Sequence, residues 1–374
     1  MRPRAVALAT IALCGTSASA LAAAEGIGAR LEAGAEYDSN PTRVETLDGV
    51  PSSRPTVPSP ALRLALNLDA ERVLFGRWSA SLGAGLAVRR LLQADAQGED
   101  LLVSEARAAL SRLLAPSWAL GAQASLYDVG QRADSLEEAR DFRSISPGAR
   151  LLGPLGAGRF SLGAGWRWFR FKPAPSLDFA GPTVSLGYRR NPVFTLDGAA
   201  EWDWGLGTAL EQRRFDPQPC SDATACAGAA QTQRQDRFVT LDADLTRTGD
   251  QLVGAGLSLQ NNRSNQFGEN LWRLAAHLRL VWLLPLDLSL AARGELVLTR
   301  YDDAVAVGHD AVSGAFVTIE EEGRSSARID LSHPLGEHLE AGVRFTVYAQ
   351  APGSGPLHFS RQLFLGYLAL ALGR

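Results

Sequence analysis

The chain has 374 residues, of which 46% are hydrophobic and 21% charged, with 37 glycines and 19 prolines. This composition excludes a disordered protein, which combines low hydrophobicity with high charge. The net charge of −3 offers no basic surface for nucleic acid, so we expect no nucleic-acid partner. After the N-terminal region no apolar run reaches about 18 residues, which excludes a bundle of transmembrane helices.

The N-terminal residues predict a secretory signal peptide. Two arginines lie within residues 1–4, residues 5–13 form an apolar run, and Ala-x-Ala cleavage sites follow at residues 18–20 and 22–24. We expect cleavage after Ala24, because Glu25 then directly precedes the first periodic segment. Residues 1–24 are therefore predicted to be the signal peptide, and residues 25–374 the mature domain.

Two cysteines remain after removal of the signal peptide, Cys220 and Cys226. In an oxidising compartment such a closely spaced pair predicts a disulfide bond at a loop tip. A structural metal site would need about four ligands, and no histidine or other cysteine lies close enough in the sequence to complete one. We expect neither a metal nor a cofactor.

From residue 27 onward, most segments alternate between apolar and polar residues with a period of two, which is typical of β-strands. In residues 27–37 the apolar face carries Ile27 and Leu31, while Arg30, Glu32 and Glu36 lie on the other face. The same pattern continues along the chain, clearest in residues 62–68, 78–88, 160–168, 239–245 and 339–347. We count about sixteen such segments, the even number that a closed antiparallel barrel needs. Residues 101–113 and 311–319 are ambiguous, so the range is about fourteen to eighteen strands.

The connections between these segments alternate in length. The short ones lie near residues 74–77, 114–117, 153–158, 190–192, 248–251, 283–286 and 333–338. The longer ones lie near residues 38–60, 90–100, 128–141, 171–180, 205–235 and 301–323, with shorter exceptions at 263–268 and 350–356. This alternation is typical of an outer-membrane barrel, with tight periplasmic turns and long extracellular loops.

All eight tryptophans fall on the apolar face near the end of a predicted strand. We expect Trp78 and Trp118 to open upward strands, Trp166, Trp168, Trp202 and Trp204 to close upward strands, and Trp272 and Trp282 to lie at opposite ends of one downward strand. At about 3.3 Å per residue and a tilt of roughly 40°, the last two are about 25 Å apart vertically, the height of a lipid-facing band. Core tryptophans would occur at mid-strand as often as at strand ends. The pattern therefore predicts two aromatic girdles.

These three signals together resemble the single-chain outer-membrane β-barrels of Gram-negative bacteria over residues 26–372. The C-terminus departs from the pattern of these proteins, which usually end in an aromatic residue: Phe364, Leu368, Leu370 and Leu372 alternate, but Gly373 and Arg374 follow. The resemblance implies an all-β, transmembrane, up-and-down barrel in the cell outer membrane. Outer-membrane lipid and lipopolysaccharide would be its surroundings.

The string Tyr37-Asp38-Ser39-Asn40-Pro41 is similar to the opening of barrels that accompany exopolysaccharide secretion systems. That resemblance implies a secreted polysaccharide as cargo and a periplasmic polysaccharide-export component as partner.

A barrel of about sixteen strands has a lumen wide enough for water, so its polar face would line a channel. Neither sign of charge dominates on that face, which suits a neutral hydrophilic solute such as a sugar chain. The candidate pore-lining residues are Arg63, Arg89, Arg107, Arg167, Arg279, Arg293, Arg344, Glu105, Glu201, Asp242 and Asp244. Alternatively, these charges pair across neighbouring strands and only brace the wall.

The predicted function is a channel for hydrophilic material, with secreted exopolysaccharide as the preferred cargo and a general diffusion porin as the alternative. A structural barrel and a lipid-modifying enzyme are further alternatives. His358 and Ser360 would share a face near the outer rim, but no acidic partner completes a catalytic set, so we expect no enzyme. Residues 205–235 either fold inward as a constriction or form an exposed loop stiffened by its cysteine pair.

Overall fold

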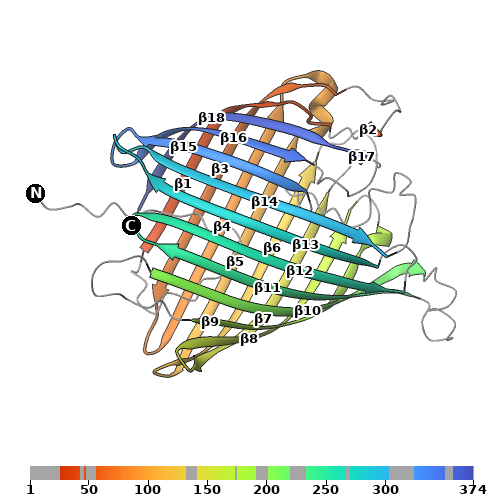
Figure 1. Cartoon of the computed structure of the whole chain (residues 1–374), viewed down its shortest axis with the longest axis vertical. Helices are drawn as coiled ribbons and strands as arrows, with labels where there is room; N and C mark the ends of the chain where they lie inside the picture. The colour runs from red at the N-terminus through yellow and green to blue at the C-terminus, as the bar shows by residue number, and fades with distance from the viewer. Residues whose placement is uncertain are drawn as a thin grey trace, which may run out of the picture.

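The computed structural model describes residues 26–42, 46–47, 56–131, 141–172, 175–190, 201–219, 233–265, 270–302, 324–349 and 357–373. Sixteen of the described strands form one closed antiparallel barrel, in which β1 pairs with β18 (Figure 1). They are β1 (Gly26–Asp38), β3 (Ser59–Val73), β4 (Trp78–Leu91), β5 (Leu101–Ala115), β6 (Trp118–Gln131), β7 (Phe142–Leu155), β8 (Gly158–Phe171), β9 (Phe179–Arg190), β10 (Glu201–Pro219), β11 (Gln233–Thr248), β12 (Gln251–Ser264), β13 (Leu271–Leu283), β14 (Ser289–Tyr301), β15 (Ser325–Pro334), β16 (Leu339–Ala349) and β18 (Ser360–Leu372). The predicted up-and-down barrel of about sixteen strands is confirmed.

Four short elements lie in the connections. β2 (Thr46–Leu47) pairs with β17 (Leu357–His358), which joins the connection after β1 to the connection before β18. The 3₁₀ turns η1 (Ala94–Glu99) and η2 (Pro175–Leu177) precede β5 and β9. Within the described ranges, no helix is both long enough and apolar enough to cross a membrane.

The barrel has a turn end and a loop end. The turn end holds residues 74–77, 116–117, 156–157, 249–250, 284–288 and 335–338, together with the start of β1 and the end of β18. One of these turns uses two consecutive left-handed residues, Leu286 at φ 65° and Asp287 at φ 57°, a backbone that suits the twist of a hairpin. The opposite end, where η1 lies between β4 and β5 and η2 lies before β9, is the loop end.

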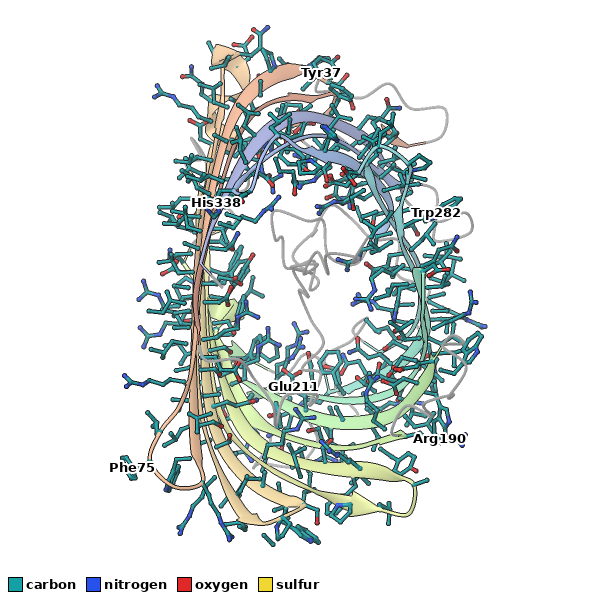
Figure 2. The ribbon with its side chains drawn as sticks, turned by 90° about the vertical axis from the view of Figure 1, so that its left-hand side faces the viewer. Tyr37, Phe75, Arg190, Glu211, Trp282 and His338 are labelled. Atoms are coloured by element: carbon teal, nitrogen blue, oxygen red, sulfur yellow. The ribbon has the colours of Figure 1, made fainter. Side chains whose placement is uncertain are left out.

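Alternation separates the two faces of every strand. On β1, Ile27 and Tyr37 are exposed on the outside, whereas Glu32 and Glu36 are buried inside the barrel. Figure 2 shows the same division, with Glu211 pointing into the barrel and Trp282 on its outer surface. The exterior carries the exposed large hydrophobic residues and the interior carries the charges, which is the reverse of a protein in water.

The long connection predicted at residues 205–235 is wrong for most of its length. β10 continues to Pro219 and β11 begins at Gln233, so residues 205–219 belong to the barrel wall. Glycines at 205 and 207 resemble a loop in the sequence, but each lies on the inward face of a paired strand. Cys220 and Cys226 lie outside the described residues, as does the signal peptide, so both remain predictions.

The predicted positions of Trp202 and Trp204 are also wrong, because β10 begins at Glu201 rather than ending near Trp204. Both residues therefore lie at the turn end. The tryptophans still form two groups on the outer face: Trp78, Trp118, Trp202, Trp204 and Trp282 at the turn end, and Trp166, Trp168 and Trp272 at the loop end.

Some inward glycines make room for a long side chain on the next strand. Gly342 on β16 lies opposite Tyr367 on β18, and a Cβ atom at position 342 would lie 2.7 Å from Cε1 of the tyrosine ring. The phenol folds over the glycine and donates a hydrogen bond to Asp330 Oδ1 at 2.7 Å. This packing requires a residue without a side chain at position 342.

We predict that Gly342→Val destabilises the barrel by about 1–3 kcal/mol, because the added atoms displace the Tyr367 ring. The measurement is the urea midpoint of the barrel refolded into lipid vesicles, followed by tryptophan fluorescence. Gly366→Val is the matched control, since a Cβ at position 366 meets nothing within 4 Å. Equal midpoints for the two variants would contradict the prediction.

Candidate channel lumen

The inward charges of the first strands meet those of the last strands where the barrel closes. Asp38 is fully buried and accepts a hydrogen bond from Arg361 at 2.6 Å and another from Arg89. Arg89 also binds Glu36 at 2.7 Å, and Glu36 is buried as well. Carboxylates at the end of β1 are thus neutralised by arginines of β4 and β18.

A second set of ion pairs lies nearer to the turn end of the same strands. Arg344 binds Glu32 through two hydrogen bonds of 2.9 and 3.1 Å and binds Asp330 at 2.6 Å. Arg30 pairs with Glu340 at 3.0 Å. We call Glu32, Glu36, Asp38, Arg89, Asp330, Arg344, Arg361 and Tyr367 the seam network.

Apolar side chains fill the space beside the seam network. Leu363, Leu365 and Ala369 of β18 are buried on the inward face of the strand. Together with the paired charges, they make this side of the interior a packed layer. Buried pairs of this kind are sensitive to the loss of one partner, because the remaining charge is left uncompensated.

The inward charges of β9 to β14 are more exposed, and we call this surface the open wall. Arg189 retains 44% of its side-chain exposure while it pairs with Asp203 at 2.8 Å and Asp244 at 2.9 Å. Arg293 retains 45% and lies 3.8 Å from Glu295. Half-exposed charges of both signs therefore face the interior from β9 to β14. Of these strands, β9 and β10 lie across the barrel from the seam network, and β14 borders it at β15.

Small residues form the middle of the neighbouring strands. The inward positions there are Gly148, Gly163, Gly165, Ser185, Gly187 and Gly207 on β7 to β10. Strands that carry glycine and serine on one face project little into the interior. This part of the wall is polar through its backbone and hydroxyl groups, and Arg150, opposite Gly163, is a long inward side chain among these small residues.

Inward aromatic rings form a row near the loop end of β6 to β10. Consecutive ring centroids are 5.7, 5.3, 4.9 and 5.3 Å apart, and the rings belong to Tyr127, Phe142, Phe169, Phe179 and Phe215. Arg213 lies 4.8 Å from the centre of the Phe179 ring and 4.0 Å from that of Phe238. The phenylalanines are buried, so this row stiffens the loop end of the wall.

The strand register places all of the sequence-predicted lumen residues on the inward face. Arg63, Arg89 and Arg344 lie on the seam side, Glu105, Arg107 and Arg167 on β5 and β8, and Glu201, Asp242, Asp244, Arg279 and Arg293 on the open wall. Arg279 and Arg293 lie directly opposite each other. The pairing alternative holds for the seam residues. That the open-wall residues line a conducting pore stays a prediction.

Sequence reasoning missed several residues that organise the interior. Arg361, Asp330 and Tyr367 were not candidates, although each lies at an inward position of an alternating strand. Arg213 and Phe215 were missed because their segment was assigned to a loop. Continuing the alternation Gly205, Gly207, Ala209, Glu211 would have found both.

The alternative of a lipid-modifying enzyme gains no support from the described contacts. Ser360 opens β18 on the outward face, and its backbone oxygen accepts a hydrogen bond from the Asn40 side chain at 3.1 Å. Within the part of the chain that the structure describes, no group of three or more His, Cys, Asp or Glu residues is arranged to hold a metal ion.

No family model matches this sequence, and no curated protein matches it. Among solved structures, the barrel is similar to Pseudomonas putida OprB, with a TM-score of 0.50, 11% identity, and coverage of 93% of this chain and 94% of that one. It is also similar to Pseudomonas aeruginosa OpdQ (TM-score 0.47, 9% identity, 93% and 98% covered) and to Salmonella typhi OmpF (TM-score 0.46, 8% identity, 92% and 97% covered). At these identities the likeness shows a shared fold.

Such structures are Gram-negative outer-membrane porins and channels, and none of them links the chain to exopolysaccharide secretion. The apolar exterior leads to the same location independently. Leu82, Leu257 and Leu278 are each more than half exposed on the outer face, which requires lipid around the barrel. The predicted location in the outer membrane is confirmed.

We predict that Arg344→Ala destabilises the barrel by about 3–5 kcal/mol, because Glu32 and Asp330 are left buried without their shared cation. Arg107→Ala is the control: its side chain is 52% exposed and lies 3.5 Å from Glu105, so its loss costs at most about 1 kcal/mol. Urea unfolding in vesicles measures both. The double variant Arg344→Ala/Glu32→Gln should recover part of the loss, and no recovery would argue against a charge effect.

Proposed function

We propose that this barrel is a passive diffusion channel for small hydrophilic solutes. The observation that carries the proposal is the open wall, where half-exposed charges of both signs, such as Arg189 with Asp244, face the interior. A wall of this kind binds no single class of ion strongly, and it offers hydrogen bonds to neutral polar solutes. We propose no catalytic role.

The strand number supports a path for water. Barrels of eight strands are filled by their own side chains, whereas barrels of about sixteen leave an aqueous channel. Since the seam network and the leucines of β18 fill one side of the interior, solutes would pass along the open wall and the small residues of β7 to β10. The channel would therefore lie off the barrel axis.

Exopolysaccharide export remains the second candidate, and it is supported only by the five-residue resemblance at residues 37–41. Three of these residues bind β18 through their side chains. Asp38 binds Arg361, the Ser39 hydroxyl accepts a hydrogen bond from the backbone N–H of Gln362 at 2.8 Å, and the Asn40 side chain donates to the backbone oxygen of Ser360 at 3.1 Å. A requirement for closing the barrel explains these residues without any cargo. A diffusion channel is therefore the better supported function.

We predict a stable open conductance for the refolded mature protein in a planar bilayer, with weak selectivity between cations and anions. Asp242→Asn/Asp244→Asn should shift the permeability ratio toward anions by about twofold in dilute salt, where charges are least screened, and Arg279→Gln/Arg293→Gln should shift it toward cations. Arg247→Gln is the control, because Arg247 lies on the outward face of β11.

A silent bilayer would contradict the passive channel. Repeating the recording after reduction of Cys220 and Cys226 then tests whether the predicted disulfide holds a closed state. Export is tested separately in cells: loss of surface polysaccharide after deletion of the gene, with small-solute uptake unchanged, would favour the exporter. Reduced solute uptake with polysaccharide unchanged would favour the diffusion channel.

A further inference from the structure

Two pairs of arginines lie directly opposite each other on the outer face of the barrel, both at the loop end. Arg143 on β7 faces Arg170 on β8, and Arg237 on β11 faces Arg263 on β12. All four side chains are exposed. Residues opposite each other in antiparallel strands have Cβ atoms about 5 Å apart, and like charges at that separation are destabilising. An anion that binds both arginines of a pair would offset this repulsion.

The carboxylates around these pairs neutralise them only in part. Asp128 accepts hydrogen bonds from Arg143 at 2.6 Å and from Lys172 at 2.8 Å, so one acid serves two cations. Asp302 pairs with Arg263 at 3.1 Å. Within the described residues, Arg170 and Arg237 form no ion pair. Each pair keeps an excess of positive charge.

Tryptophans fix the height of these arginines relative to the membrane. Trp168 precedes Arg170 by two residues on the same outward face of β8, and Trp166 lies two residues further down. Interfacial tryptophans mark the boundary between the hydrocarbon layer and the headgroups. The arginines lie just beyond that boundary, so the groups that reach them are lipid headgroups.

The turn end of the outer face is built differently. Its outward arginines lie opposite small or apolar residues: Arg72 faces Ala80, Arg190 faces Gly158, and Arg247 faces Trp202. Arg112 lies over the Trp78 ring at 5.4 Å. In the described part of the turn end, no two outward arginines are paired across strands. The arginine pairs thus belong to one leaflet.

We propose that the pairs Arg143/Arg170 and Arg237/Arg263 are binding sites for the phosphate groups of lipopolysaccharide in the outer leaflet. Each guanidinium presents parallel N–H groups that match two phosphate oxygens, so one phosphate bridges two arginines and removes their repulsion. Lys172 adds a third cation at the first site, and Arg214, which lies opposite Gln235, adds one at the second. This proposal is independent of what passes through the lumen.

The experiment measures binding of phosphorylated lipopolysaccharide to the purified full-length barrel in non-ionic detergent, by native mass spectrometry and by the shift in melting temperature. Arg237→Gln/Arg263→Gln and Arg143→Gln/Arg170→Gln should each weaken binding, by about tenfold for each charge-assisted hydrogen bond lost. Arg72→Gln/Arg247→Gln is the matched control with the same charge change at the turn end, and it should bind like the wild type.

Folding and repulsion are read in the same samples. Without lipopolysaccharide, the loop-end variants should melt no lower than the wild type, since they remove like-charge repulsion. Addition of lipopolysaccharide should then raise the melting temperature of the wild type more than that of the variants. Equal binding by loop-end and turn-end variants would overturn the proposal. So would equal binding of dephosphorylated lipopolysaccharide, or full competition by millimolar inorganic phosphate, which would point to a site for free anions.

Discussion

The pairing of β1 with β18 is the constraint on which the barrel depends. It closes the sheet, so that no strand edge carries unpaired backbone groups into the lipid, where each such group would be costly. The same closure brings Asp38 to Arg361 and Glu32 to Arg344, residues that are 323 and 312 positions apart in the chain. The acids of the first strand obtain these partners only when the last strands are in place. Closure and charge neutralisation are therefore coupled steps.

The charges inside the barrel fall into two groups that differ in burial. Where acids and arginines from the two ends of the chain meet, they are buried against each other and against leucines of β18. On the opposite side, pairs such as Arg189 with Asp203 join neighbouring strands and stay half exposed. The first group supports the barrel and the second faces the space through which solutes would pass. The inward charges thus have two roles: the buried ones stabilise the barrel, and the half-exposed ones face the open interior.

The period-two pattern was sufficient to predict strands, their number and their lipid-facing side, because a strand residue has only two directions in which to point. It was insufficient for partners across the closure, since nothing near Asp38 in the sequence identifies Arg361. It also failed at residues 205–219, where inward glycines remove the contrast between the two faces. The start of β10 fixes the height of Trp202 and Trp204 in the barrel. Because the pattern does not identify that start, it places both tryptophans at the wrong end.

Departures from the binary pattern carry the most specific information. Phenylalanines at inward positions, such as Phe169 and Phe179, are unexpected on a polar face, and they form the stacked row near the loop end. Arginines at outward positions, such as Arg237 and Arg263, are unexpected on an apolar face, and they lie where the tryptophans place the headgroups. A lipid-facing surface tolerates charge only at its borders. Among the described residues, outward arginines are paired at one border alone. These pairs therefore distinguish the two leaflets, which the apolar band between them does not.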